Sequence, residues 1–307
     1  MNFQKSPILV IVFIFTYSIS YSQNSVTAQI KDSILRLLQP ASLPFDVKSK
    51  ESYQSGNATV QEISFRVNAE HKASAWLTSP QKEDKKSPLL IFIHWGGGNK
   101  DEFLKEAITF TSKGFICMSL DAPWHWNTYD TTKDFLLNYP SNIQLSVLSV
   151  KRAIDLAISQ YNADNKKVFY IGHSYGATLG GLLAAAEPRI KAMILIAGLP
   201  NISASMITDA RGFWQNDKAN RKTLFDQVTH RLSLMEPEDY INLSKAKVYH
   251  QYGTEDEIVS PDDTQRYIKA SKNLVTAKGY KTDHLLDSEA AVGDRIKWMC
   301  EKAGLVR

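Results

Sequence analysis

Short, continuously apolar segments recur along the chain from residue 89 onward, and they leave few possible folds. Residues 89–93 read Leu-Leu-Ile-Phe-Ile, and comparable segments follow at 115–120, 168–171, 192–197, 247–252 and 274–279. Helical patterns or loops separate them, including a helix from Ser141 and a last helix over about 290–302. Strands that are apolar on both faces are typical of a parallel sheet covered by helices. The sequence therefore predicts an α/β fold with a mostly parallel central sheet and helices on both faces.

The remaining segments add edge strands and an insertion to this sheet. The apolar spacing over 30–38 predicts an amphipathic helix that Pro40 ends. Alternating apolar residues at 63–67 and 73–77 predict half-buried strands, which we expect to be antiparallel neighbours. The stretch of about 200–240 is too long for an ordinary connection between strands, and it predicts a lid-like insertion. We expect residues 23–307 to form a single domain.

Residues 1–22 have the pattern of a secretory signal peptide. Lys5 is the only charge in the first 30 residues, an apolar run follows at 8–15, and Ser20 and Ser22 are small residues before a cleavage site. That run is about half of the ~20 residues that a membrane-spanning helix needs. No later segment is long and apolar enough to cross a bilayer. We therefore expect a secreted or periplasmic protein with no membrane span in its mature form.

Composition excludes several classes of protein. A chain that is 43% hydrophobic is not disordered, and 2 cysteines are too few for a disulfide scaffold. We expect Cys117 and Cys300 to be separately buried thiols. The net charge of +4 is small and spread along the chain, so it does not indicate a nucleic-acid partner.

A strand followed by a glycine-flanked serine indicates a serine nucleophile. Residues 172–176 read Gly-His-Ser-Tyr-Gly, directly after the apolar strand at 168–171 and before a helix of small residues. As a bare string G-x-S-x-G is weak, but in this setting it predicts a nucleophile elbow. There a strained strand-to-helix turn exposes the serine hydroxyl, here that of Ser174, while the glycines leave room for the turn.

A serine nucleophile needs a base, and the base needs an acid that orients it. Of the histidines after Ser174, His230 lies in the lid-like stretch and His250 lies within a strand, whereas His284 follows the last strand in a loop. His284 is therefore the predicted base. The predicted acid is Asp256, because it follows the strand at 247–252 at the edge where open α/β sheets place their sites. The neighbouring residues 255 and 257 are also acidic, and position alone separates the three carboxylates poorly.

These residues carry a family resemblance over roughly 60–305. The chain resembles the α/β-hydrolase superfamily, especially its dienelactone-hydrolase-like and prolyl-oligopeptidase-like members. Their Gly-x-x-Asp-x-x-Val-Pro segment is matched by Gly253, Asp256 and Val259, although Pro261 stands one place late. The Asp-His pair at 283–284 before the last helix also fits. The resemblance implies an α/β-hydrolase fold with antiparallel N-terminal edge strands and a serine hydrolase activity without a cofactor.

The segment after the strand at 89–93 resembles the family's oxyanion loop. Residues 94–98 read His-Trp-Gly-Gly-Gly, where the family usually has His-Gly-x-Gly-Gly. By this resemblance the backbone N–H groups of Gly96 and Tyr175 would stabilise the developing oxyanion. Trp95 stands where a glycine is usual, which leaves Trp95 and Gly96 as alternatives for the first donor. His94 ends the wrong strand for a base and is expected to be a structural hydrogen-bonding group.

Aromatic residues follow two of the strands on the side where Ser174 should lie. Trp95, Trp124 and Trp126 either pack the lid or form an apolar wall for an acyl, aryl or sugar group of the substrate. Metal-ligand spacings and a phosphate-binding loop are missing from the sequence, so we expect no metal and no cofactor.

Together these features predict a secreted serine esterase that acts on a small-molecule ester through a triad of Ser174, Asp256 and His284. A prolyl-oligopeptidase-like peptidase is one alternative, although only about 60 mature residues precede the hydrolase-like segment. A hydrolase-like binding protein without catalysis is the other, and the complete set of triad residues argues against it. The identity of the ester and the oligomeric state are left open by the sequence.

Overall fold

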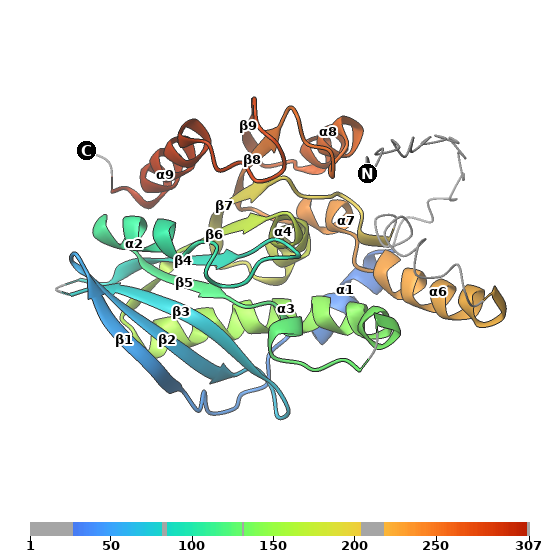
Figure 1. Cartoon of the computed structure of the whole chain (residues 1–307), viewed down its shortest axis with the longest axis horizontal. Helices are drawn as coiled ribbons and strands as arrows, with labels where there is room; N and C mark the ends of the chain where they lie inside the picture. Colours follow the sequence, from blue (N-terminus) through green and yellow to red (C-terminus); the bar gives the residue numbers. More distant parts are fainter. Residues whose placement is uncertain (1–26, 82–84, 131, 204–217, 306–307) are drawn as a thin grey trace, which may run out of the picture.

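The computed structural model describes residues 27–81, 85–130, 132–203 and 218–305. The predicted signal peptide at 1–22 lies outside these ranges. Within them the chain forms one sheet of nine strands in the order β1-β2-β3-β5-β4-β6-β7-β8-β9. Figure 1 shows β1 to β3 at one edge of this sheet and β8 and β9 at the opposite end.

The sheet has an antiparallel edge and a parallel body. The antiparallel ladders join β1 (Lys48–Ser55), β2 (Ala58–Arg66), β3 (Lys72–Pro80) and β5 (Ile116–Leu120). Parallel ladders then join β5 to β4 (Ser87–Ile93), β6 (Ala163–His173), β7 (Ile190–Ile196), β8 (Lys247–Gly253) and β9 (Leu274–Tyr280). Central strands such as β4 and β7 are buried on both faces because helices cover both sides. The predicted mostly parallel sheet with antiparallel edge strands is confirmed.

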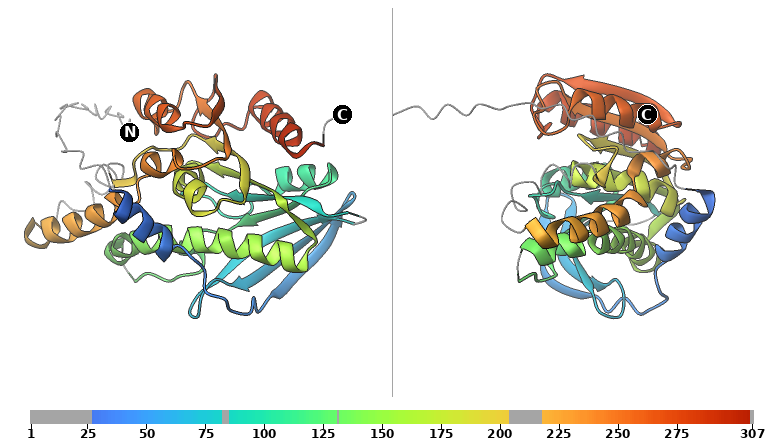
Figure 2. Two further views of the ribbon diagram at one scale, coloured as in Figure 1. Left: turned by 180° about the vertical axis from the view of Figure 1, so that it is seen from behind. Right: turned by 90° about the vertical axis from the view of Figure 1, so that its right-hand side faces the viewer.

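Helices lie on both faces, each over its own cluster of buried apolar side chains. One face is covered by α2 (Leu104–Ser112) and α9 (Glu289–Ala303). The other is covered by α1 (Ala28–Leu37), α3 (Thr132–Gln160), α4 (Tyr175–Ala186) and α8 (Pro261–Ala270). Figure 2 shows α1 and α3 on the same face when the molecule is seen from behind. Over the described ranges, no helix combines the length and the apolar character that a membrane crossing requires.

One local expectation was wrong, and one strand was missed. The helix expected from Ser141 begins earlier, since α3 starts at Thr132 and contains Pro140. A short 3-10 helix, η1 (Pro123–His125), precedes it. The strand β1 was not expected at all, because nearly all of its residues are exposed and it has no apolar alternation. Its backbone is nevertheless held by the ladder to β2.

The two cysteines lie in different layers. Cys117 is in β5 and Cys300 in α9, and both are buried free thiols, as predicted. Burial raises the pKa of the Cys117 thiol to about 12, so it stays protonated at neutral pH and is inert as a nucleophile.

The predicted lid-like insertion at about 200–240 is described only in part, since residues 204–217 lie outside the described ranges. Its described elements are α6 (Lys218–Ser233) and α7 (Pro237–Ile241). The buried Glu236 side chain binds the backbone at the beginning of this stretch: its carboxylate accepts the N–H groups of Ile202 at 2.5 Å and of Ser203 at 3.2 Å. Burial outweighs these hydrogen bonds and raises the Glu236 pKa to about 7.

This raised pKa predicts a pH-dependent loss of stability. Between the ordinary value of 4.5 and about 7, the folded chain binds the Glu236 proton more tightly than the unfolded chain does. Raising the pH through that window therefore lowers the free energy of unfolding, by up to about 3 kcal/mol. Thermal melting from about pH 5 to about pH 8 should show the wild type falling relative to Glu236→Gln. Melting temperatures that change in parallel over this range would contradict the assignment.

Candidate active site

Ser174 lies in the sharp turn between β6 and α4, at the carboxyl edge of the parallel strands. Its backbone has φ 50° and ψ −105°, a combination that a residue with a side chain adopts only under constraint. Hydrogen bonds supply the constraint: the Ser174 N–H donates to the Ile196 carbonyl at 2.7 Å, and its carbonyl accepts the Thr178 N–H at 2.8 Å. The turn therefore has the strained geometry of a nucleophile elbow.

The two glycines of the motif are required by the packing around this turn. A Cβ atom on Gly172 would overlap the backbone of Gly176, and one on Gly176 would overlap the backbone carbonyl of Ile93 in β4. Helix α4 thus passes so close to β4 and β6 that only hydrogen fits at these positions. The sequence pattern predicted this close helix-on-strand approach.

His284 and Asp256 meet Ser174 in a chain of hydrogen bonds. The His284 Nε2 atom lies 2.8 Å from the Ser174 Oγ atom, and the His284 Nδ1 atom lies 2.8 Å from the Asp256 Oδ2 atom. Because an ionised carboxylate only accepts, Nδ1 carries the hydrogen and Nε2 is left to accept the serine proton. The structure thus brings together the three residues that the sequence singled out, from the loops after β6, β8 and β9.

Asp256 is held as a charged acceptor. Its Oδ1 atom accepts the N–H groups of Ile258 at 2.8 Å and Val259 at 2.9 Å. Burial alone would raise the Asp256 pKa, but the hydrogen bonds from His284 and from these two amides outweigh it and hold the pKa below its usual value. The neighbouring acids Glu255 and Glu257 are exposed, so the structure separates the three carboxylates that the sequence could not.

The other two histidines after Ser174 are placed elsewhere. His230 is exposed on α6. His250 is buried within β8, where its Nε2 atom lies 2.8 Å from the Ser271 hydroxyl. Burial lowers the His250 pKa to about 3 and keeps the ring neutral. Both positions agree with their rejection as the base.

Two backbone N–H groups, one in the loop after β4 and one directly after Ser174, are available for an oxyanion. Trp95 is excluded, because its N–H donates to the Glu102 Oε2 atom at 2.9 Å. The N–H groups of Gly96 and Tyr175 have no hydrogen-bond acceptor within the part of the chain that the structure describes. Tyr175 is the first residue of α4, where helix N–H groups lack intrahelical partners. This geometry favours Gly96 over Trp95 as the first donor.

His94 connects the oxyanion loop to the loop after β5. Its ring is buried, the Nδ1–H donates to the Trp95 carbonyl at 2.6 Å, and Nε2 accepts the Ala122 N–H at 2.9 Å. Its own carbonyl accepts the Gly176 N–H at 3.2 Å, which ties the loop to the elbow. The expected role of His94 as a structural hydrogen-bonding group is confirmed.

The three tryptophans lie in different surroundings. The Trp95 indole folds back over its own loop, since Cβ atoms on residues 97 and 98 would lie within 3 Å of its ring atoms. The Trp124 ring meets the Tyr175 ring edge-on at 4.6 Å between centroids, beside the elbow. The Trp126 Nε1–H donates to the Asp121 carbonyl at 3.3 Å. Of these contacts, that of Trp124 is with Tyr175, the first residue of α4.

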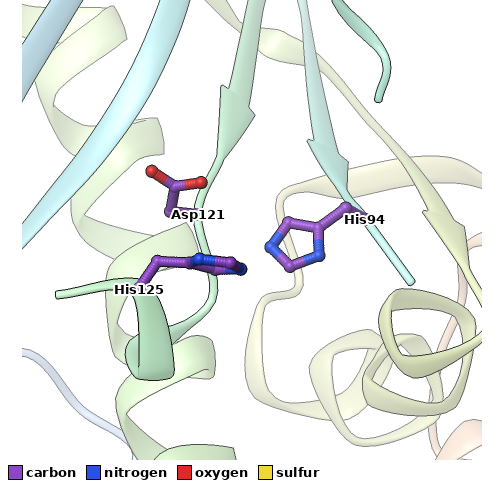
Figure 3. A group of neighbouring side chains, drawn as sticks. All are labelled: His94, Asp121 and His125. Carbon is purple, nitrogen blue, oxygen red and sulfur yellow. The ribbon is translucent and has the colours of Figure 1, made fainter. Parts of the chain in front are cut away.

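One group of side chains near the site has metal-ligand chemistry. The ligand atoms of His94, Asp121 and His125 lie within 4.8 Å of one another (Figure 3). Each already has a protein partner: Asp121 accepts the Lys100 N–H and Nζ, His125 Nε2 donates to the Gly98 carbonyl, and both His94 nitrogens are used. A cation bound here would have to displace the Ala122 amide from His94. The group is explained by hydrogen bonding between two loops.

Comparison with known proteins identifies relatives of this chain. Residues 88–248, just over half of the chain, match the model of the alpha/beta hydrolase fold family. Residues 32–135 match the acetyl xylan esterase (AXE1) model. Acetylxylan esterase A of Aspergillus oryzae is 24% identical over 202 residues, which are 64% of this chain and 63% of that protein. A putative hydrolase of Bacillus subtilis, YtaP, is 23% identical over 54% of this chain and 62% of its own length. The chain thus spans less than two thirds of these relatives.

Solved structures with the same fold cover more of the chain. Acetyl xylan esterase 1 from a Thermoanaerobacterium species superposes with a TM-score of 0.74 at 17% identity, covering 91% of this chain and 95% of that chain. A putative dienelactone hydrolase from Klebsiella pneumoniae gives a TM-score of 0.61 at 15% identity, covering 80% and 98%. At such identities the likeness concerns the fold, and the chemistry must be argued from the site itself.

Proposed function

Because the chain belongs to the alpha/beta hydrolase fold family, we propose that it is a serine esterase that cleaves carboxylic esters through an acyl-enzyme intermediate. One observation carries this proposal: the two 2.8 Å hydrogen bonds that join Asp256 to His284 and His284 to the strained Ser174. This arrangement has the geometry that activates a serine hydroxyl for nucleophilic attack.

The proposed reaction proceeds in two halves. Ser174 Oγ attacks the ester carbonyl while His284 Nε2 takes its proton, and Asp256 stabilises the imidazolium that forms. The N–H groups of Gly96 and Tyr175 donate to the oxygen that becomes negative. His284 then protonates the departing alcohol and leaves an acyl group on Ser174. Water, deprotonated by His284, then attacks this acyl-enzyme, and His284 returns the proton to Ser174 Oγ as the carboxylic acid is released.

The proposed substrates are acetyl esters of sugars, including acetylated xylan fragments. The match of residues 32–135 to the acetyl xylan esterase model supports this choice, as do the names of the curated relatives. The half-buried Trp124 ring, which meets the Tyr175 ring edge-on, is an aromatic surface of the kind that stacks on a sugar ring. The predicted signal peptide at 1–22 supports export to where such polysaccharides occur.

A panel of substrates tests this function. We expect the purified protein to hydrolyse p-nitrophenyl acetate faster than the butyrate, to leave feruloyl esters nearly untouched, and to release acetate from acetylated xylo-oligosaccharides. Ser174→Ala, assayed at the same concentration, is the control and should abolish each activity. Ester hydrolysis that survives in Ser174→Ala would overturn the proposal. Cleavage of proline-containing peptides without any ester hydrolysis would favour a peptidase instead.

A further inference from the structure

A second buried histidine lies directly behind the proposed base. His173, the residue before the nucleophile, is only 3% exposed, and its ring centroid lies 5.3 Å from that of His284. Its Nδ1 atom lies 2.6 Å from the Glu102 Oε1 atom, and its Nε2 atom lies 2.8 Å from the backbone carbonyl oxygen of His284. His173 thus connects the end of β6 to the loop that carries the base.

The hydrogens on this ring follow from its partners. A backbone carbonyl only accepts, so the His173 Nε2 atom must donate to His284. The contact between the His173 Nδ1 atom and the Glu102 Oε1 atom needs one further hydrogen, which lies between the ring and the carboxyl group. His173 is buried and Glu102 is partly exposed, and each makes a further hydrogen bond, His173 with the His284 carbonyl and Glu102 with the Trp95 N–H.

Glu102 reaches two parts of the site at once. While its Oε1 atom meets His173, its Oε2 atom accepts the Trp95 N–H at 2.9 Å, directly before the Gly96 N–H. Gly98 makes room for this, because a Cβ atom there would lie 2.9 Å from Oε2. A single carboxylate therefore links the oxyanion loop to the elbow and, through His173, to the main chain of His284.

We propose that Glu102 and His173 form a positioning pair. The pair holds the Gly96 N–H group and the His284 side chain in their places relative to Ser174. This inference rests on the proposed esterase function and extends it. Neither side chain has a role in the proton transfers, and His173 makes its contact through the backbone of His284. The pair acts by orientation, and a displacement of about 1 Å in such a site can cost roughly 10²-fold in rate.

The span of Glu102, more than its charge, is the property that the geometry requires. Glutamine keeps this span: its Oε1 atom can accept the Trp95 N–H while its amide donates to Nδ1 of a neutral His173, which keeps its Nε2–H for His284. Aspartate keeps the charge but is shorter by one carbon–carbon bond, about 1.5 Å, and cannot reach both partners. Alanine loses both contacts.

The experiment compares Glu102→Gln, Glu102→Asp and Glu102→Ala on p-nitrophenyl acetate, with wild type and Ser174→Ala as references. We expect kcat to fall by about 10²-fold in the aspartate and alanine variants, with KM within roughly threefold, and by less than about tenfold in the glutamine variant. The matched control is Glu187→Ala, which removes a buried carboxylate that pairs with Arg189 at the far end of α4. Its kcat should stay at the wild-type value.

Each outcome separates the two levels of the proposal. Wild-type protein without Ser174-dependent turnover would overturn the esterase function and this inference with it. Ser174-dependent turnover that is unchanged in Glu102→Ala would overturn the inference alone. So would an aspartate variant more active than the glutamine variant, because that order would show that charge matters more than reach. Circular dichroism and melting temperatures above the assay temperature establish that each variant is folded, so an unfolded variant is not scored as a loss of positioning.

Discussion

Ser174→Ala and His284→Ala are each expected to lower kcat for acetyl esters by about 10⁴–10⁶-fold, and the double variant is expected to fall no further. The two side chains act as one unit, since the Ser174 hydroxyl is a weak nucleophile until the His284 Nε2 atom, 2.8 Å away, removes its proton. Once either is missing, the other has nothing left to contribute. The residual rate then reflects only binding and the oxyanion donors.

Single-turnover and steady-state rates on p-nitrophenyl acetate measure this coupling. KM should change little in all three variants, because neither side chain is proposed to hold the substrate in its ground state. The control is His230→Ala, because His230 is exposed and its replacement is expected to leave kcat unchanged. His250→Ala is less suitable, because that ring is buried and hydrogen-bonded to Ser271. Losses that multiply in the double variant would show that Ser174 and His284 act in separate steps.

Asp256→Asn is expected to lower kcat by about 10³–10⁴-fold while leaving the fold intact. The reason is specific to this loop. The Asp256 Oδ1 atom accepts two backbone N–H groups, from Ile258 and Val259, so the carbonyl oxygen of an asparagine must occupy that position. Its amide NH₂ would then face the His284 Nδ1 atom, where an acceptor is needed. His284 would then adopt the opposite tautomer, with its hydrogen on Nε2. A protonated Nε2 atom cannot take up the proton of Ser174.

Steady-state kinetics on acetyl esters test the tautomer argument, with Glu255→Gln as the matched control. Glu255 is the adjacent carboxylate and is exposed, so its neutralisation should leave kcat within about twofold of wild type. An Asp256→Asn variant that retains more than about a tenth of the wild-type kcat would mean that another group orients the base.

The sheet and the placement of Ser174, Asp256 and His284 could be predicted because they follow from local patterns. A continuous apolar strand such as 89–93 indicates burial on both faces of the sheet. The carboxyl ends of parallel strands lie at the same edge of the sheet. Residues directly after β6, β8 and β9 therefore had to be neighbours. The glycines at 172 and 176 likewise followed from the turn between strand and helix.

Other features depend on contacts that no local pattern contains. The edge strand β1 has no buried face and is held by backbone hydrogen bonds to β2. The helical turns before Pro140 are not signalled, because proline usually marks a boundary. Choosing between Trp95 and Gly96 as oxyanion donor required the position of Glu102, a partly exposed acid next to the first turn of α2 that in sequence resembles an ordinary solvated residue. Its link to His173, 71 residues away, is visible only in three dimensions.

The most direct test of the central claim is to locate the nucleophile chemically. A fluorophosphonate forms a stable covalent bond with an activated serine, and mass spectrometry of the labelled protein and its peptides identifies the residue. We expect one adduct per chain, on the peptide that contains Ser174, with no adduct in Ser174→Ala and a much slower reaction in His284→Ala. Wild-type protein that hydrolyses acetyl esters yet stays unlabelled at Ser174, or is labelled elsewhere, would contradict a Ser174 acyl-enzyme.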